Sequence, residues 1–305
     1  MSNKVKDLKN QYLEYLEIEK GRSQKTLENY GRYLDRFLNF AKIETVSSLS
    51  EDVIRQYRLH LNRIRDSDNQ PLKRVTQNYH VIALRNFLKY LAKIQIKAVT
   101  AERIELGKQE DRSVTFLERD ELQKILESPD TKSIDGLRDR AIFSTLFSTG
   151  LRVSELCSLN KDKIDLNRGE FSVRGKGSKI RLVFLSEDSK DDIKNYLAKR
   201  KDVDEALFVR IPKGGSFSKF DNLRLTPRSV QRIVKKYTIK AGIIGKEVTP
   251  HTIRHSYATD LLRNGADIRS VQAMLGHSSV TTTQIYTHVT DKQLRDVHKK
   301  FHGKK

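Results

Sequence analysis

The first hundred residues repeat an apolar pattern with helical spacing. In "SQKTLENYGRYLDRFLNFAK" the apolar positions on one helical face are Leu27, Tyr30, Leu34, Phe37 and Leu38. Residues three and four apart share a face of an α-helix, so this stretch predicts an amphipathic helix. Ser23 stands just before it and is a plausible N-cap, because its hydroxyl can accept a hydrogen bond from a first-turn amide.

Two further stretches repeat the pattern. "SEDVIRQYRLHLNRI" carries Val53, Tyr57, Leu61 and Ile64, and "KRVTQNYHVIALRNFLKYLAK" carries Val75, Tyr79, Ile82, Leu84 and Leu88. The polar turn "RDSDNQP" separates them. We therefore predict a helical domain over residues 1–100.

The pattern changes after an acidic, weakly periodic segment, "AERIELGKQEDRSV", which we interpret as a linker over residues 101–115. Residues 116–305 then mix helices with one alternating stretch. "GLRDRAIFSTLFSTG" predicts a helix that ends at Gly150. "EFSVRGKGSKIRLVFL" has period two on both sides of "GKGS", with apolar residues at Phe171, Val173, Ile180, Leu182 and Phe184, and it predicts a β-hairpin.

Helices return in "TPRSVQRIVKKYTIKAG", "TPHTIRHSYATDLLRNG" and "DIRSVQAMLGH". Thr249 suits the N-cap of the second of these, and Pro250 suits its first turn. The fold class predicted is mainly α with a small β-hairpin, in two domains.

Charge is the strongest compositional feature. The 305 residues carry a formal net charge of +20, which favours a polyanionic partner such as nucleic acid over a merely basic surface. Cys157 is the single cysteine, so no intramolecular disulfide and no cysteine cluster for zinc can form. The first residues lack the apolar core of a signal peptide, and no apolar run reaches the roughly 20 residues that span a bilayer. We expect a cytoplasmic protein that does not enter membranes.

Several basic residues could serve such a partner. In "TPHTIRHSYAT", His251 and Arg254 are three apart at a helix start, where free amides and positive side chains favour phosphate. His251 and His255 have the spacing of a zinc helix, but Thr252 stands where the catalytic glutamate would be, so no metal is expected. Arg152, beside a turn, and Lys176, at the hairpin tip, are by themselves ordinary solvated charges.

Tyr286 lies in "GHSSVTTTQIYTH", between His277 and His288. Alone it is more often a packed aromatic residue, because a phenol with a pKa of about 10 is a poor nucleophile at neutral pH. Nearby cations would change this, since they favour phenolate and stabilise charge on a pentavalent phosphorus. Two arginines, a lysine, histidines and a tyrosine together can cleave a phosphodiester without metal or ATP.

Four motifs in order resemble the tyrosine recombinase (phage integrase) family, most closely its Xer-type members. They are "GLRVSEL", "GKGSKIRLV", "TPHTIRHSYATDLL" and "LGHSSVTTTQIYTHV". The resemblance covers residues 116–305 strongly, and residues 1–100 only as a helical core-binding (SAM-like) domain. It implies that Arg152 and Arg254 clamp the scissile phosphate and that His277 adds a hydrogen bond to it. Glu155 matches a position that orients the first arginine, although a helix-surface charge is an equally good interpretation.

The remaining catalytic roles also follow from the resemblance. Tyr286 would be the nucleophile, His251 would act on its proton, and Lys176 would serve the leaving hydroxyl. No cofactor is implied. The tail "LRDVHKKFHGKK" is similar to the Xer terminus, where it docks onto a neighbouring protomer, so Leu294, Val297 and Phe301 are candidate docking residues. We expect no arm-binding domain before the helical domain, which favours an Xer-like enzyme over the larger phage integrases.

The function expected is a site-specific DNA recombinase whose two domains close around double-stranded DNA. Four protomers on two sites, alone or with a related second recombinase, would exchange strands through a 3′-phosphotyrosine and a Holliday junction. Candidate DNA-binding residues are Lys73, Arg74, Arg85, Lys179, Arg181, Arg228, Arg232 and Lys235. For each of these a solvated surface charge is an equal alternative.

Two other functions use the same residues. A type IB topoisomerase shares this chemistry but relaxes supercoils as a monomer, and a non-catalytic DNA-binding regulator would show a decayed catalytic position. All six catalytic positions of the family are filled here. The motifs do not separate chromosome-dimer resolution from integration or excision of a mobile element.

Overall fold

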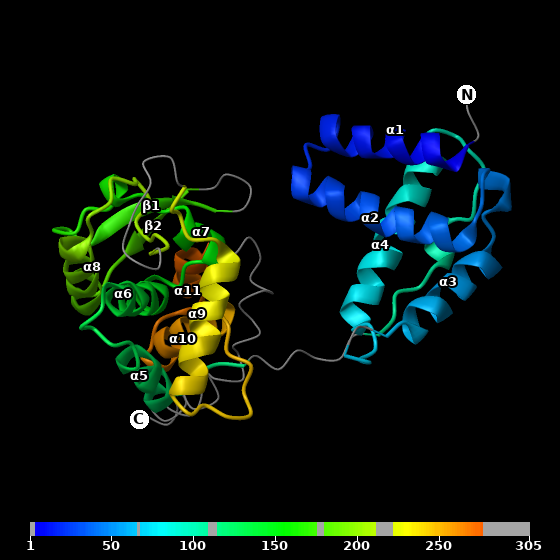
Figure 1. Ribbon diagram of the computed structural model, residues 1–305. Coiled ribbons are helices and arrows are strands. Elements are labelled where there is room, and N and C mark those ends of the chain that lie inside the picture. The colour runs from blue at the N-terminus through cyan, green and yellow to red at the C-terminus, as the bar shows by residue number, and fades with distance from the viewer. Residues whose placement is uncertain (1–3, 66–67, 109–114, 176–179, 212–221, 277–305) are drawn as a thin grey trace, which may run out of the picture. The chain divides into compact units, whose positions relative to one another are not determined.

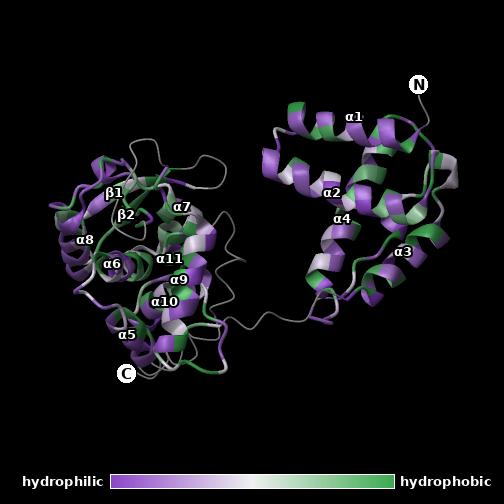
Figure 2. Cartoon of the chain, viewed as in Figure 1, coloured by the Kyte–Doolittle hydropathy of each residue, from purple (hydrophilic) through white to green (hydrophobic). Residues whose placement is uncertain are grey.

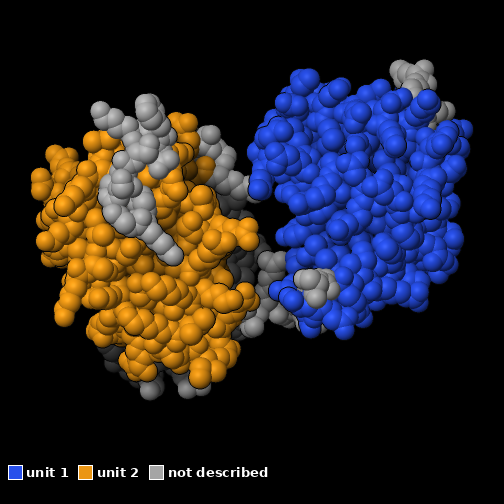
Figure 3. Space-filling view, in the orientation of Figure 1, with its two compact units in different colours: residues 1–111 blue, residues 112–305 orange. Residues whose placement is uncertain are grey.

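The computed structural model describes residues 4–65, 68–108, 115–175, 180–211 and 222–276. The chain divides into two compact units, residues 1–111 and 112–305 (Figures 1 and 3). The described helices include none that is long and apolar enough to cross a membrane.

The first unit is built from α-helices. They are α1 (Val5–Ile18), α2 (Gln24–Ala41), α3 (Glu51–Arg63) and α4 (Arg74–Lys93), with single 3₁₀ turns η1 (Val46–Ser48) and η2 (Ala101–Arg103). Figure 2 shows hydrophobic and hydrophilic residues alternating along these helices. Helix α4 contacts the other three and supplies the centre of the core, with Leu84, Phe87 and Leu91 almost fully buried. The mainly helical fold predicted for this part of the chain is confirmed.

Two details of this unit differ from the sequence prediction. Tyr79 is 47% exposed, because the buried face of α4 runs instead through its neighbours Asn78 and His80. The ring of His80 accepts or donates a 2.9 Å hydrogen bond with the Tyr57 hydroxyl, which lets a polar side chain occupy the core. The Ser23 hydroxyl does not cap α2 through a backbone amide and contacts the Thr26 hydroxyl at 3.0 Å instead.

The second unit packs its helices around α6. Its elements are α5 (Arg119–Glu127), α6 (Ile134–Thr149), α7 (Val153–Cys157), η3 (Lys161–Lys163), β1 (Glu170–Arg174), β2 (Ile180–Phe184), α8 (Glu187–Lys199), α9 (Pro227–Lys240), α10 (Pro250–Arg263) and α11 (Ile268–Leu275). Helix α6 contacts α5, α8, α10 and β2 and is buried on nearly every side. Such a helix has no single apolar face, and its buried residues include the charged Arg138 and Asp139.

Strands β1 and β2 form the predicted antiparallel hairpin, with Phe171 paired to Val183 and Val173 paired to Arg181. The alternation predicts the hairpin correctly. However, the residues of β2 that face the core are not the apolar residues of the alternating pattern. Ile180, Leu182 and Phe184 are 67%, 48% and 49% exposed, respectively, whereas Val183 is buried. Arg181 lies on the inward face of β2, between the exposed apolar residues.

The ends of α6 and α10 follow local chemistry. Gly150 ends α6 in the left-handed region, with φ of 58°, as its sequence position predicts. The Thr249 hydroxyl accepts a hydrogen bond from the Thr252 amide, and Pro250 opens α10. These two ends fix the positions of Arg152 and of the helix that carries His251 and Arg254.

Candidate active site

Arg254 is buried at the start of α10, with only 4% of the residue exposed. Its guanidinium donates one hydrogen bond to the carbonyl oxygen of Gly150 and another, 2.6 Å long, to that of Leu275. A buried guanidinium is tolerated only where acceptors replace water. The Arg254 side chain therefore connects the start of α10 to the end of α6 and to the end of α11.

Arg152 lies at the N-cap of α7 and is more accessible, with 27% of its side chain exposed. Its Nη2 donates to the carbonyl oxygen of Gly276 at 3.3 Å, and its Nη1 donates to Glu155 Oε1 at 2.9 Å. The two arginines thus contact consecutive carbonyls, those of Leu275 and Gly276. His277, the next residue of the chain, lies outside the described residues.

Glu155 is the buried anion that organises this site. Its carboxylate accepts a 2.8 Å bond from the Arg152 amide and two bonds, of 2.9 and 2.7 Å, from the guanidinium of Arg181. Burial opposes ionisation, but the hydrogen bonds from Arg181 and Arg152 outweigh it and lower the pKa of Glu155 to about 2. Glu155 therefore holds a full negative charge at neutral pH and fixes Arg152 by its backbone and its side chain.

Arg181 is not placed as the DNA contact suggested by the sequence. Its side chain is only 9% exposed, and its guanidinium is engaged by Glu155 and by the carbonyl oxygen of Met274. An arginine that neutralises a buried carboxylate has little left to offer a phosphate, which corrects that expectation. Sequence alone gave no signal for this role, because Glu155 and Arg181 are 26 positions apart.

Arg181 also packs against the last described residue before His277. Gly276 has φ of 63°, and a Cβ there would lie 3.0 Å from Arg181 Cδ. Glycine is favoured at this position both by the left-handed backbone and by the close side chain. The hairpin that carries Lys176 is thereby connected to the two arginines and to the segment that leads to Tyr286.

His251 lies beside both arginines. Partial burial and the positive charges of Arg254 and Arg152 lower the pKa of the His251 ring, and burial and the charge of His251 lower that of His255 to about 4. Both rings are therefore neutral at neutral pH, and a neutral imidazole can accept a proton. In the part of the chain that the structure describes, no three His, Cys, Asp or Glu side chains group as metal ligands would.

The other predicted residues fall into two groups. Lys176, Lys179, His277 and Tyr286, and the tail residues Leu294, Val297 and Phe301, lie outside the described residues. Lys73, Arg74, Arg228, Arg232 and Lys235 are exposed or partly exposed, and Arg85 is half-buried. The exposed set is accessible to a partner, and the last three of its members lie along one face of α9.

Sequence comparison identifies the family. The pattern of the phage integrase family matches residues 115–293, and that of the phage integrase N-terminal SAM-like domain matches residues 10–95. The chain belongs to the phage integrase family. Tyrosine recombinase XerC of Thermodesulfovibrio yellowstonii is 36% identical over 95% of this chain and 94% of its own length. Tyrosine recombinase XerD of Staphylococcus epidermidis is 35% identical over 96% and 97%, respectively.

Solved structures of recombinases share the fold. The XerA recombinase, 28% identical, aligns over 98% of this chain and all of its own with a TM-score of 0.52. The Tn1549 transposon integrase in complex with a circular intermediate DNA, 18% identical, aligns over 96% of this chain and 99% of its own with a TM-score of 0.72. The phage integrase family member described here is accordingly a tyrosine recombinase of the Xer type and a site-specific recombinase. These matches do not favour the topoisomerase alternative.

Proposed function

We propose that Tyr286 is the nucleophile of this recombinase and that it forms a covalent 3′-phosphotyrosine with DNA. Its phenolic oxygen attacks the scissile phosphorus, the bond from phosphorus to the 5′-oxygen breaks, and a proton passes to that 5′-oxygen. Attack of a 5′-hydroxyl from another strand reverses the step and releases the tyrosine. Because the phosphotyrosine retains the energy of the broken phosphodiester, neither ATP nor a divalent ion is required.

The contact of Arg152 and Arg254 with the consecutive carbonyls of Leu275 and Gly276 carries this proposal. It supports a site in which two guanidinium groups stand where the chain enters the segment of His277 and Tyr286. A guanidinium presents five N–H donors in a fixed fork, a geometry that matches the non-bridging oxygens of a phosphate. Charge that grows on those oxygens in the transition state is then stabilised by preorganised cations.

The proton steps are assigned to three residues. His251, whose pKa is lowered, takes the proton of the Tyr286 phenol, and Lys176 gives a proton to the leaving 5′-oxygen. His277 donates a hydrogen bond to a phosphate oxygen. The roles of Lys176 and His277 rest on the motifs "GKGSKIRLV" and "LGHSSVTTTQIYTHV".

The assembly is proposed on the same basis. Four protomers, alone or with a related second recombinase, bind two double-stranded DNA sites in the cytoplasm and exchange strands in pairs through a Holliday junction. Leu294, Val297 and Phe301 dock each protomer onto its neighbour. The reaction resolves chromosome dimers or integrates and excises a mobile element, and the position of the cleaved site in the genome distinguishes the two.

A covalent trap tests the chemistry. Wild type, Tyr286→Phe and Tyr257→Phe are incubated in EDTA with nicked duplexes drawn from the source chromosome and from the flanks of the gene, and denaturing gels report adducts. Tyr257 is a matched control, because its hydroxyl contacts Met274 Sδ at 3.6 Å within the same unit. An EDTA-resistant adduct that only Tyr286→Phe abolishes is expected.

Three outcomes would contradict parts of the proposal. An adduct that persists in Tyr286→Phe would exclude this tyrosine as the nucleophile. Tight binding without any adduct would indicate either that a second recombinase is required or that the protein only binds DNA. Adducts with supercoil relaxation at random sequence, but without recombinant product, would indicate a topoisomerase and would contradict the proposed tetramer.

A further inference from the structure

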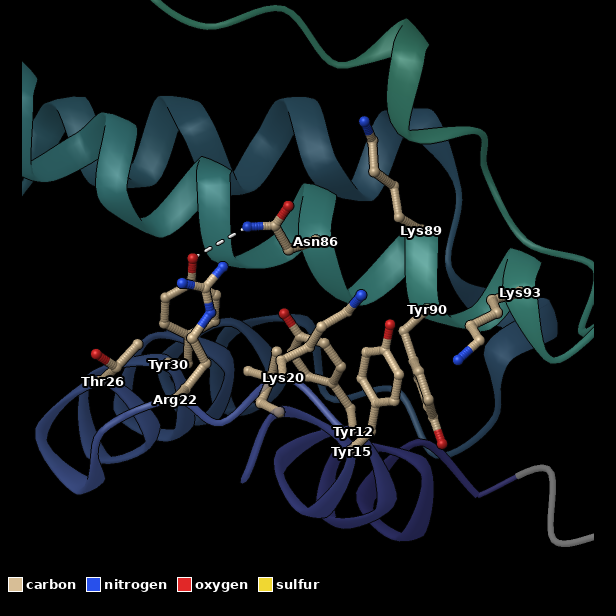
Figure 4. Close-up of a pocket in the computed structure, with 11 residues that line it drawn as sticks. Tyr12, Tyr15, Lys20, Arg22, Thr26, Tyr30, Asn86, Lys89, Tyr90 and Lys93 are labelled. Carbon is tan, nitrogen blue, oxygen red and sulfur yellow. Dashed lines mark hydrogen bonds between the residues drawn. The ribbon is translucent and has the colours of Figure 1, made fainter. Parts of the chain in front are cut away.

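A hollow of about 200 Å³ lies in the first unit, between the end of α1, the start of α2 and the last turns of α4. Figure 4 shows its lining, in which the rings of Tyr12 and Tyr30 lie beside the long basic side chains of the α1–α2 connection. None of its lining residues is acidic. The hollow belongs to the unit that lacks the catalytic motifs, so the proposed chemistry does not account for it.

Four cationic side chains surround the hollow, namely Lys20, Arg22, Lys89 and Lys93. Lys93 pairs with Glu19 at 2.8 Å and Lys89 with Glu102 at 3.7 Å. Within the described part of the chain, Lys20 and Arg22 have no carboxylate partner. Lys20 contacts the ring of Tyr15, with Nζ 5.6 Å from the ring centroid. Two cations are therefore held at the hollow with their charges uncompensated by acidic side chains.

Two tyrosine hydroxyls add hydrogen-bond donors beside these two positive charges. The Tyr12 hydroxyl is buried and has no hydrogen-bond partner among the described residues, although an orphaned buried hydroxyl costs about 1–3 kcal/mol. The Tyr30 hydroxyl accepts a 3.0 Å bond from Asn86 Nδ2, which leaves its own proton to donate. Figure 4 shows Lys20 and Arg22 beside these two phenols.

This set defines the ligand by its chemistry. Ammonium, guanidinium and phenol groups all donate, so the complementary group is a small anion rich in acceptor oxygens. We propose that this hollow, formed by Tyr12, Lys20, Arg22 and Tyr30, binds a phosphate group. The phosphate can belong to a DNA backbone or to a small phosphorylated molecule, and only the DNA source rests on the proposed function. The Tyr12 hydroxyl is buried, so its donation to the anion requires a neighbouring side chain to move on binding.

Three variants of the full-length chain test the site. Lys20→Gln with Arg22→Gln removes the two uncompensated charges at exposed positions. Lys6→Gln with Lys97→Gln removes the same charge from exposed positions of the same unit outside the hollow, and serves as the control. Tyr12→Phe deletes only the orphaned hydroxyl, so we expect it to fold with unchanged or higher thermal stability while it weakens phosphate binding.

Inorganic phosphate is the first probe, with sodium chloride at matched ionic strength as reference. We expect phosphate to raise the melting temperature of wild type and of the control, and to have no effect on Lys20→Gln with Arg22→Gln. Non-cognate duplex DNA is the second probe, with affinity measured across salt concentrations. If the phosphate comes from DNA, the pocket variant lowers the salt slope by roughly 0.9, which is the contribution of one phosphate contact.

The outcomes separate the two sources. Phosphate stabilisation without a change in duplex affinity assigns the site to a free phosphorylated ligand. A slope lowered only by the pocket variant assigns it to the DNA backbone. If phosphate stabilises no variant and the control changes the slope as much as the pocket variant, the site does not exist. The covalent trap at Tyr286 is read separately, so its failure does not bear on this result.

Discussion

Glu155 is a buried carboxylate whose charge is balanced by two arginines, and its neighbour Arg181 contributes the bidentate contact. In Arg181→Met the carboxylate keeps, among the described residues, only its contacts with Arg152. Breaking a buried ion pair by removing one partner typically costs about 3–5 kcal/mol, because the other charge stays desolvated. We expect a loss of that order in the free energy of unfolding, measured in urea at neutral pH.

Arg228→Met is the control for that substitution. Arg228 lies exposed on α9, where replacement of a surface side chain changes stability by no more than about 0.5 kcal/mol. Arg181→Lys keeps the charge but not the bidentate geometry, so its stability should fall between wild type and Arg181→Met. Equal stability of Arg181→Met and Arg228→Met would show that Arg181 does not hold Glu155.

The same carboxylate predicts a pH dependence. Its pKa is lowered from 4.5 to about 2 in the folded chain, so the folded state binds the proton less well than the unfolded state. The resulting stabilisation is complete above the unfolded pKa and is lost as the pH falls from about 4.5 toward 2. We expect the stability difference between wild type and Glu155→Gln, measured by urea unfolding, to narrow steadily between about pH 5 and 3. A constant difference would contradict the lowered pKa.

At the scale of elements, the end of α6 depends on Gly150. A Cβ at this position would lie 2.4 Å from Tyr257 Cδ1, and the backbone has φ of 58°. Gly150→Ala therefore combines a left-handed alanine, which costs about 1–2 kcal/mol, with overpacking, which costs about 1–3 kcal/mol. We expect a loss of roughly 2–5 kcal/mol in the free energy of unfolding, together with a displaced Arg152 and slower adduct formation.

Gly242→Ala separates these two costs. Gly242 has φ of 69°, but nothing lies within 4 Å of the position that a Cβ would take. Only the backbone cost of about 1–2 kcal/mol should appear there. If the two alanine variants lost the same stability, the contact with Tyr257 would not contribute.

Elements whose formation depends on nearby residues could be predicted from the sequence. Gly150 ends its helix and Thr249 caps the next one because each acts through neighbours a few positions away. The inner face of β2 could not be predicted, because Arg181 faces inward to meet Glu155, a partner distant in the sequence. The apolar residues Ile180 and Leu182, on either side of Arg181, suggest instead that the other face of β2 packs against the core.

In the candidate site, too, the sequence predicts what depends on nearby residues but not the contacts between residues that are distant in the sequence. The motifs place Arg152, His251 and Arg254 in order along the chain, but they carry no sign of the carbonyls of Leu275 and Gly276 that both arginines contact. The sequence likewise gives no sign of the phosphate site proposed in the first unit. Its aromatic residues, such as Tyr12, have core spacing, and only the tertiary packing leaves a hydroxyl there without a partner among the described residues.

At the scale of the whole molecule, the net charge of +20 favours an acidic partner, and only the solvent-accessible charges can contact such a partner. Arg228, Arg232 and Lys235 are accessible along α9, whereas Arg181 is engaged by Glu155. Each phosphate contact contributes about 0.9 to the slope of log affinity against log salt. Replacing the three α9 residues with alanine should therefore lower the slope for duplex DNA by roughly 3, three times that contribution. Arg181→Met, compared at a temperature where it is folded, should leave the slope unchanged. If the salt slope changed in Arg181→Met and not in the α9 variant, Arg181 would contact DNA and the α9 residues would not.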